Sequence, residues 1–245
     1  MRVMLTIAYD GTDYVGWQVQ PNGISVQEVL NRELSSFFGH DISTIGASRT
    51  DAGVHALGNV CVFDVDSPMP AEKISLAVNK SLPPDIVIQS SREVSGDFHP
   101  RFSNSIKTYE YAVLNRDIPI PTLSRYSYFY HHRLNDERMR EAAGVLVGEH
   151  DFTSFASIHS QTKTFVRTIH DIVITRDEND MVRIRIRGNG FLYNMVRIIV
   201  GTLLHIGSGL MEVSDMERVL LAKKREEAGP TAPAQGLTLM EIRYL

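Results

Sequence analysis

The sequence predicts an α+β protein made of two halves of similar design. Strands with alternating apolar side chains recur along the whole chain, and amphipathic helical segments stand between them. The two halves show the same succession of elements without a detectable sequence repeat. A polar, glycine-containing stretch at 90–105 could join them, so we expect halves at 1–104 and 105–245.

The first half has the order of a small α+β sandwich built on an antiparallel sheet. Ser25 and Glu28 form a capping box for a helix whose apolar spacing ends near Gly39. Pro70 fits the first turn of a second helix, which the prolines at 83–84 end. Alternating side chains predict four strands, at 2–10, 42–47, 60–65 and 86–88.

The second half repeats this alternation of strands and helices. Asn135 should cap a helix that runs to Val147, and the largely apolar run 192–206 predicts a buried helix. Ser214 and Glu217 have the spacing of a second capping box, which predicts another short helix. The predicted strands lie at 107–114, 164–175, 181–187 and 237–242.

The composition is that of an ordinary soluble globular protein, with 43% hydrophobic and 22% charged residues. No apolar run approaches the roughly 20 residues that span a bilayer, and the first residues lack a secretory signal pattern. The single cysteine, Cys61, excludes an internal disulfide framework, so we expect a cytoplasmic protein. The net charge of −4 argues against nonspecific nucleic-acid binding but allows a local basic groove.

The most informative segment is 47–56, ASRTDAGVHA, which lies between two predicted strands. Thr50 and Asp51 can fold their side-chain oxygens back onto the backbone, and Gly53 permits a positive φ. These features predict a rigid turn, in which a lone carboxylate can be aimed at a ligand as a nucleophile or base. The same residue types also form ordinary turns, so the local sequence leaves both interpretations open.

Arginines provide further candidates for function. Arg183, Arg185 and Arg187 alternate along a predicted strand and therefore share one face. Such a row suits phosphates, but a solvated sheet face would explain it as well. Arg197 lies within an apolar helical run, where a buried guanidinium needs a carboxylate partner. We prefer Asp51, which this pairing would keep ionised, and surface snorkelling of Arg197 is the alternative.

Several other chemistries lack their motifs in this sequence. The nine histidines show no HExxH spacing, and neither a GxxxxGK phosphate loop nor a GxSxG serine motif occurs. We therefore expect no metal, no nucleotide cofactor and no serine hydrolase activity. Tyr109 and Tyr111 share one face of a predicted strand, which is more typical of packing than of ligand binding.

Seven segments, taken in order, make the chain resemble the TruA family of tRNA pseudouridine synthases nearly from end to end. They are YDGT with GWQ at 9–18, SVQ at 25–27, SRTDAGVHA at 48–56, FHPRFS at 98–103, KTYEY at 107–111, GFLYNMVR at 190–197 and PAQGL at 233–237. Ser48 and Asn59 depart from the usual glycine and glutamine of the family. Both flank the predicted catalytic loop, so these departures bear on substrate preference rather than on the reaction.

The resemblance implies conversion of uridine to pseudouridine in the anticodon stem-loop of tRNA, at positions 38, 39 and 40, without a cofactor. It also implies a homodimer in which one tRNA contacts both subunits. The implied fold has two α+β halves whose antiparallel sheets join into one central sheet, with the active-site cleft between the halves.

The resemblance also assigns roles to single residues. Asp51 would be catalytic, by attack on C1′ or C6 or by taking a sugar proton to give a glycal. Tyr109 would lie beneath the uracil, Arg197 would pair with Asp51, and Arg49 would fill the space left by the flipped nucleotide. The implied RNA-binding residues are Phe98, His99, Arg101, Phe102, His159 and Lys163.

Two other functions stay open on the sequence. Alternating strands with arginines suit an RNA-binding module without catalysis, although the aromatic signature of the RRM is missing. Asp51 would also suit a nucleoside N-glycosidase, but hydrolytic glycosidases generally use two carboxylates and no second acid occupies a comparable loop. The product separates the three functions, because only a glycosidase releases uracil and a binding module leaves uridine unchanged.

Overall fold

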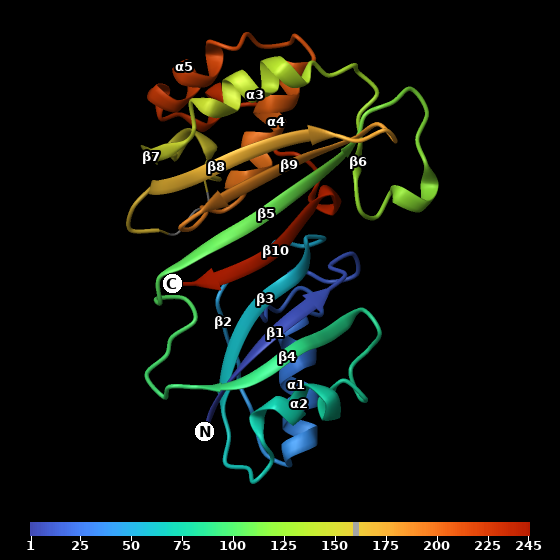
Figure 1. Cartoon of the computed structure of the whole chain (residues 1–245), viewed down its shortest axis with the longest axis vertical. Coiled ribbons are helices and arrows are strands. Elements are labelled where there is room, and N and C mark those ends of the chain that lie inside the picture. Colours follow the sequence, from blue (N-terminus) through green and yellow to red (C-terminus); the bar gives the residue numbers. More distant parts are fainter. Residues whose placement is uncertain (159–161) are drawn as a thin grey trace. The chain divides into compact units, whose positions relative to one another are not determined.

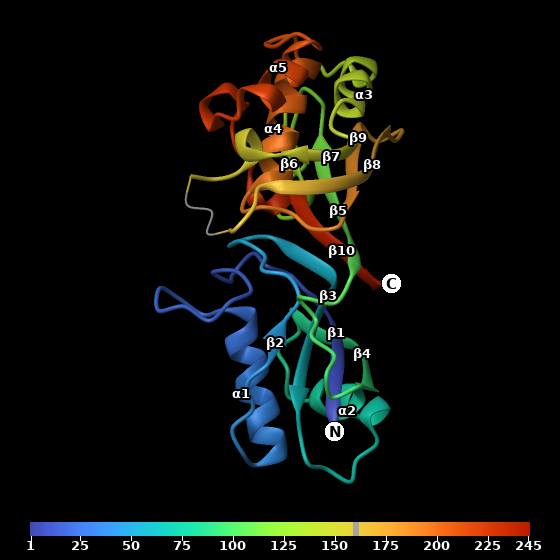
Figure 2. The ribbon, with the colours of Figure 1, turned by 90° about the vertical axis from the view of Figure 1, so that its left-hand side faces the viewer.

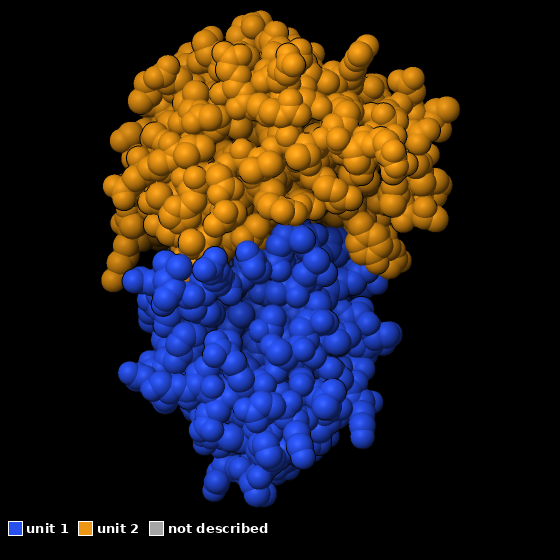
Figure 3. Space-filling view, viewed as in Figure 1, with its two compact units in different colours: residues 1–104, 238–245 blue, residues 105–237 orange. Residues whose placement is uncertain are grey.

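A computed structural model of the chain describes residues 1–158 and 162–245 (Figure 1). These residues form two compact units, which are coloured separately in Figure 3: unit 1 contains 1–104 and 238–245, and unit 2 contains 105–237. The sequence predicts that 238–245 belongs to the second half. In the structure this segment groups with unit 1, because Thr238 and Leu239 pair with the strand that carries His55.

Unit 1 is built on strands in the order β4-β1-β3-β10. Strand β1 (Arg2–Tyr9) is antiparallel to both of its neighbours, β4 (Ile86–Val94) and β3 (His55–Asp64). Strand β10 (Leu237–Tyr244) runs parallel to β3, and the short β2 (Ile45–Gly46) also pairs with β3. All four strands predicted for the first half are therefore present, and β3 and β4 are longer than predicted.

Helix α1 (Val26–Phe38) begins and ends where the sequence predicts. The Ser25 hydroxyl accepts a hydrogen bond from the Glu28 backbone N–H at 3.2 Å, and the Glu28 carboxylate reaches back to complete the capping box. Gly39 ends the helix with φ 74°, a conformation that glycine adopts without strain. Figure 2 shows α1 along one side of the strands of unit 1, and its apolar face is buried there.

Helix α2 (Ala71–Val78) packs against β4, which is the edge strand of unit 1. At its end, the Asn79 side chain donates to the Ile88 carbonyl at 2.9 Å and accepts from the Ile88 N–H at 2.8 Å. These bonds satisfy backbone groups of a strand edge that would otherwise be open to pairing with another chain. Pro70 has an extended backbone and precedes the helix, so its predicted place in the first turn is wrong by one residue.

Unit 2 is built on an antiparallel sheet in the order β5-β9-β8-β7, to which β6 adds in parallel beside β5. The strands predicted at 107–114, 164–175 and 181–187 are confirmed as β5, β8 and β9. The bounds are β5 (Ser105–Leu114), β6 (Tyr128–Phe129), β7 (Gly148–Asp151), β8 (Val166–Arg176) and β9 (Met181–Gly188).

Helix α3 (Asp136–Gly144) packs against β8 and against α4 (Met195–Gly207), as Figure 1 shows. The Asn135 side chain caps α3 as predicted, by accepting from two backbone N–H groups of the first turn. Helix α4 is almost entirely buried, which confirms the prediction from its apolar run, but it begins later than predicted. Asn194 has a left-handed backbone with φ 61° immediately before it, and this turn delays the helix.

The short helix α5 (Asp215–Ala222) forms as predicted, but its expected capping box is absent. The Ser214 side chain makes no capping hydrogen bond. The Asp215 carboxylate instead accepts from the Glu212 backbone N–H at 2.8 Å, so the helix entry is held by the neighbouring residue. In the described residues, no helix is long and apolar enough to cross a membrane.

Candidate active site

Asp51 lies half-buried in the loop between β2 and β3 of unit 1. The carbonyl of the preceding Thr50 accepts from the Trp17 backbone N–H at 3.0 Å, and the Asp51 carbonyl accepts from the Val54 N–H at 3.1 Å. Gly53 has φ 77°, which meets the expectation that this turn needs a positive φ. The carboxylate therefore sits on a backbone that is fixed from two directions.

Two glycines allow the first residues of the chain to approach this loop closely. A Cβ on Gly16, whose φ is +105°, would lie 2.5 Å from the Thr50 carbonyl oxygen. A Cβ on Gly11 would lie 2.1 Å from the Val54 carbonyl oxygen. Any larger residue would collide with backbone atoms, and this close approach explains why glycine occupies both positions. The sequence motifs at 9–18 thus brace the loop that carries Asp51.

A buried polar group lies beneath the loop, and we call its four residues, Tyr9, Ser48, Thr50 and Asn59, the Tyr9 cluster. The Tyr9 hydroxyl is 2.7 Å from the Thr50 hydroxyl, and the Asn59 amide nitrogen donates to the Tyr9 oxygen at 3.2 Å. The same amide nitrogen donates to the Ser48 carbonyl at 3.1 Å. Both departures from the family pattern therefore belong to this cluster, which the sequence alone does not reveal.

Next to the loop, unit 1 presents arginines and aromatic rings. Arg49 is exposed, and Arg101 donates to the carbonyl of Gly46, which precedes the loop, at 3.3 Å. Desolvation, with a further contribution from the Arg49 charge, lowers the pKa of Arg101. The rings of His99 and Phe102 stack with their centroids 4.2 Å apart, and Phe102 is 78% exposed. Unit 1 therefore combines guanidinium groups with a stacked pair of rings, of which Phe102 is exposed.

The other predicted RNA-binding residues have different surroundings. Phe98 packs edge-on against Tyr244 with ring centroids 4.9 Å apart, and its carbonyl accepts from Arg2 at 3.0 Å. This ring is thus engaged within unit 1. Lys163 is exposed in unit 2, and His159 lies outside the described residues.

Arg197 lies in the first turn of α4 in unit 2 and is held by its own surroundings. Its Nε donates to the Ala232 carbonyl at 2.7 Å, and its Nη1 donates to the Asn194 side chain at 2.9 Å. Asn194 is the residue with the left-handed backbone at the start of the helix. These two bonds orient the guanidinium, whereas surface snorkelling would leave it in solvent.

Tyr109 is only 6% exposed, and its ring packs edge-on against Phe191 with centroids 5.2 Å apart. Phe191 and Asn194 both belong to the segment 190–194. This segment therefore contacts both predicted substrate-binding residues of unit 2, Tyr109 through Phe191 and Arg197 through Asn194. Tyr111 is fully buried, and its hydroxyl donates to the Pro233 carbonyl at 2.7 Å. Burial raises the pKa of Tyr111, and the residue has the packing role that is typical of tyrosines on strands.

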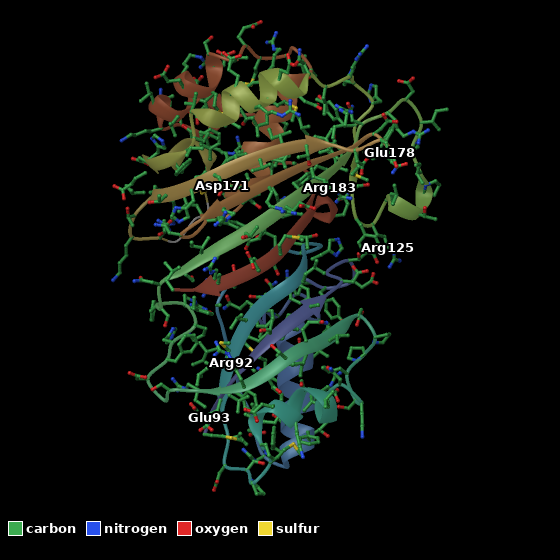
Figure 4. All side chains as sticks on the ribbon, in the orientation of Figure 1. Arg92, Glu93, Arg125, Asp171, Glu178 and Arg183 are labelled. Carbon is green, nitrogen blue, oxygen red and sulfur yellow. The ribbon has the colours of Figure 1, made fainter. Side chains whose placement is uncertain are left out.

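The arginine row of β9 is paired with carboxylates on the neighbouring strands. Arg183 and Arg185 contact Glu110 of β5 at 3.2 and 2.6 Å, and Arg187 contacts Asp171 of β8 at 3.0 Å. The three arginine side chains are 40–51% exposed. Arg183 and Asp171 are labelled on this face in Figure 4. The pairing favours a solvated, ion-paired sheet face over a phosphate-binding row.

Within the described residues, no group of three or more His, Cys, Asp or Glu side chains could hold a metal ion. Cys61 is fully buried in β3, and burial raises the pKa of its thiol. A buried thiol in its protonated form is a poor nucleophile. Among the candidates from the sequence, the loop carboxylate of Asp51 is therefore better suited to covalent chemistry.

Comparison with known proteins shows the class of protein to which these α+β units and the braced carboxylate loop belong, that of the pseudouridine synthases. The family model described as "tRNA pseudouridine synthase" matches residues 5–103 and 142–245. Proteins named tRNA pseudouridine synthase A are 45% identical in Thermoanaerobacter sp. (strain X514), 46% in Acetivibrio thermocellus and 46% in Clostridium acetobutylicum, each over 243 residues and 99% of both chains.

The chain therefore belongs to the tRNA pseudouridine synthase family, which is a family of isomerases. This confirms both the resemblance and the α+β fold class that the sequence predicts. Arg49, Asp51 and Arg197 lie within the ranges matched by the family model. Tyr109 lies between the two ranges, in a part of the chain that the full-length relatives cover.

Proposed function

We propose that this protein isomerises uridine to pseudouridine at positions 38, 39 and 40 of the anticodon stem-loop of tRNA, with Asp51 as the nucleophile. The observation that carries the proposal is Asp51 itself, a half-buried carboxylate on a loop braced from β1, Gly16 and Asn59. Similarity over 99% of the chain to proteins named tRNA pseudouridine synthase A supports the reaction and the class of RNA.

The reaction breaks the bond between N1 of uracil and C1′ of the sugar and forms a bond between C5 and C1′. The Asp51 carboxylate would attack C1′ or C6, or take a proton from the sugar to give a glycal. After the base has turned and C5 has bonded to C1′, the C5 proton leaves and N1 gains a proton. The number of atoms in the RNA is unchanged, so neither water nor a cofactor enters the balance.

The remaining residues would hold the base and the acid in place. Arg197 would pair with Asp51 and keep its carboxylate ionised, and the two bonds that orient the guanidinium support this role. The Tyr109 ring would lie beneath the uracil, and its hydroxyl would help to remove the C5 proton. Arg49, which is exposed beside Asp51, would fill the space left when the nucleotide is flipped out of its stack.

RNA recognition would depend mostly on phosphates and stacking. Arg49 and Arg101 supply positive charge at the loop, and Phe102, which is exposed and stacks on His99, offers a stacking surface. Lys163, together with Phe98 and His159, completes the set proposed from the sequence. We further propose that the enzyme acts in the cytoplasm as a homodimer in which one tRNA contacts both subunits.

Replacing Phe102 by alanine should weaken tRNA binding by roughly tenfold, because stacking of one base on an aromatic ring contributes about 1–3 kcal/mol. Phe37→Ala in α1 removes another partly exposed aromatic ring, and it should leave binding within about twofold. Filter binding at one fixed salt concentration measures both effects. Equal affinities for wild type and Phe102→Ala would remove this ring from the RNA-binding surface.

Mapping of pseudouridine tests the proposed function. Unmodified tRNA transcripts with uridine at 38, 39 or 40 are incubated with the full chain, and each position is read out separately. We expect pseudouridine at these positions, and no product in matched transcripts that carry cytidine there. Modification at other positions only would refute the anticodon stem-loop, and an absence of pseudouridine in every transcript would refute the activity.

A further inference from the structure

We propose that the Tyr9 cluster is a positioning device for catalysis, which holds the backbone of the Asp51 loop in its reactive placement. This inference rests on the proposed function, because it assigns Asp51 the nucleophilic role. The four residues of the cluster touch no reacting atom in this proposal. They act through the backbone on either side of Arg49.

The cluster is buried and its hydrogen bonds are mutually consistent. Its four residues are at most 8% exposed. The Val60 backbone N–H donates to the Asn59 side-chain oxygen at 2.9 Å, which fixes the amide so that its nitrogen faces Tyr9 and Ser48. An amide nitrogen only donates, so the Tyr9 oxygen accepts from Asn59, and the same hydroxyl shares a second hydrogen bond with the Thr50 hydroxyl.

These contacts hold the loop at two points that bracket Arg49. At Ser48 the held atom is the backbone carbonyl, and at Thr50 it is the side-chain hydroxyl. Thr50 is also held through its carbonyl by the Trp17 N–H. Asp51 is the next residue, so any change in the backbone at Thr50 shifts its carboxylate directly. A displacement of about 1 Å at a catalytic group can reduce a rate by about 100-fold.

The Tyr9 hydroxyl links Thr50 to Asn59 within the cluster. Removing it leaves the Thr50 hydroxyl and one Asn59 N–H without this partner in a buried setting, where an unmade hydrogen bond is unfavourable. The loop would then shift to recover these bonds. Tyr14 offers a matched control, because its ring is also buried but its hydroxyl donates to Asp85 at 2.9 Å, outside the cluster.

The test compares Tyr9→Phe with Tyr14→Phe in the full chain, with kcat and KM measured on unmodified tRNA. We expect Tyr9→Phe to lower kcat by about tenfold or more with KM within about twofold, because the proposed RNA contacts of His99, Arg101 and Phe102 lie outside the loop. Tyr14→Phe should keep both parameters within about twofold of wild type. Thr50→Val should behave like Tyr9→Phe, and Thr50→Ser, which keeps the hydroxyl, should lose clearly less.

A second readout does not depend on activity. Hydrogen exchange of the peptide that contains 47–56 should be faster in Tyr9→Phe than in wild type and unchanged in Tyr14→Phe. Equal kcat and equal exchange in Tyr9→Phe and wild type would overturn the inference, as would equal losses of kcat in both tyrosine variants. Wild type that binds tRNA but forms no pseudouridine would instead refute the proposed function, and the exchange comparison would still decide the positioning role.

Discussion

Replacing Asp51 by asparagine should lower the single-turnover rate of pseudouridine formation by roughly 10⁴-fold, the scale seen when an essential catalytic side chain is removed. Asparagine has nearly the same size and shape, so the loop should keep its conformation. Its amide is a poor nucleophile and carries no charge, so neither attack on the nucleotide nor proton abstraction from the sugar is supported. Nucleoside analysis after mixing tRNA with excess enzyme gives the rate, and filter binding should show tRNA affinity changed by less than about threefold.

Two further variants sharpen this prediction. Asp51→Glu keeps the charge but moves the carboxylate by one methylene, and it should also lose most of the rate because the loop is fixed. Asp41→Asn changes an exposed aspartate before β2 and should retain the wild-type rate. If Asp51→Asn kept more than about a tenth of the wild-type rate, Asp51 would not be the nucleophile.

Gly16→Ala should have the second largest effect, on both stability and rate. The new Cβ would lie 2.5 Å from the Thr50 carbonyl oxygen, and the φ of +105° disfavours any side chain. We expect a loss of about 1–3 kcal/mol in the free energy of unfolding from the backbone strain. The forced shift of the loop should lower kcat by about 100-fold. Thermal unfolding and steady-state kinetics below the transition measure the two effects.

Gly39→Ala is the matched control for this strain. Gly39 also has a positive φ, of +74°, but open space surrounds the position of a Cβ there. This variant should lose about 1 kcal/mol of stability at the end of α1 and keep the wild-type kcat. Equal kcat values in Gly16→Ala and Gly39→Ala would show that the close approach of Gly16 does not constrain the Asp51 loop.

Local signals in the sequence predicted the elements well. The capping box at Ser25, the left-handed Gly39 and the cap at Asn135 depend on residues within one helical turn, so their outcome is set nearby. The prediction failed where two local options competed, since Asp215 rather than Ser214 holds the entry of α5. These cases differ only in which neighbouring side chain accepts the backbone hydrogen bond.

Contacts between distant parts of the chain were not predictable in this way. The pairing of Thr238 with His55 places the last strand in unit 1. The sequence of neither segment indicates which strand it pairs with. For the candidate site, the sequence indicated the loop and its positive-φ glycine. It did not reveal the Tyr9 cluster, because Tyr9 and Asn59 are 50 residues apart and a tyrosine on a strand is typical of packing.

The ion pairs of the three β9 arginines were also not predictable from the sequence. A period of two correctly placed the three β9 arginines on one face. The carboxylates that pair with them, Glu110 and Asp171, lie on the neighbouring strands. Their register across the sheet therefore decides whether the row is available to phosphates. Strand register depends on the folded sheet, so the sequence left the two interpretations equal.

The fate of the uracil in labelled tRNA tests most directly whether this chain rebuilds a glycosidic bond. The tRNA carries tritium at C5 and carbon-14 in the uracil ring, and wild type is added in excess. We expect tritium from the target uridines to enter the water while all carbon-14 stays in the intact strand, where the carbon-14 of the target uridines is found in pseudouridine. Free carbon-14 uracil would indicate hydrolysis, and tight tRNA binding without tritium release would indicate a binding module; either result would contradict the proposed isomerisation.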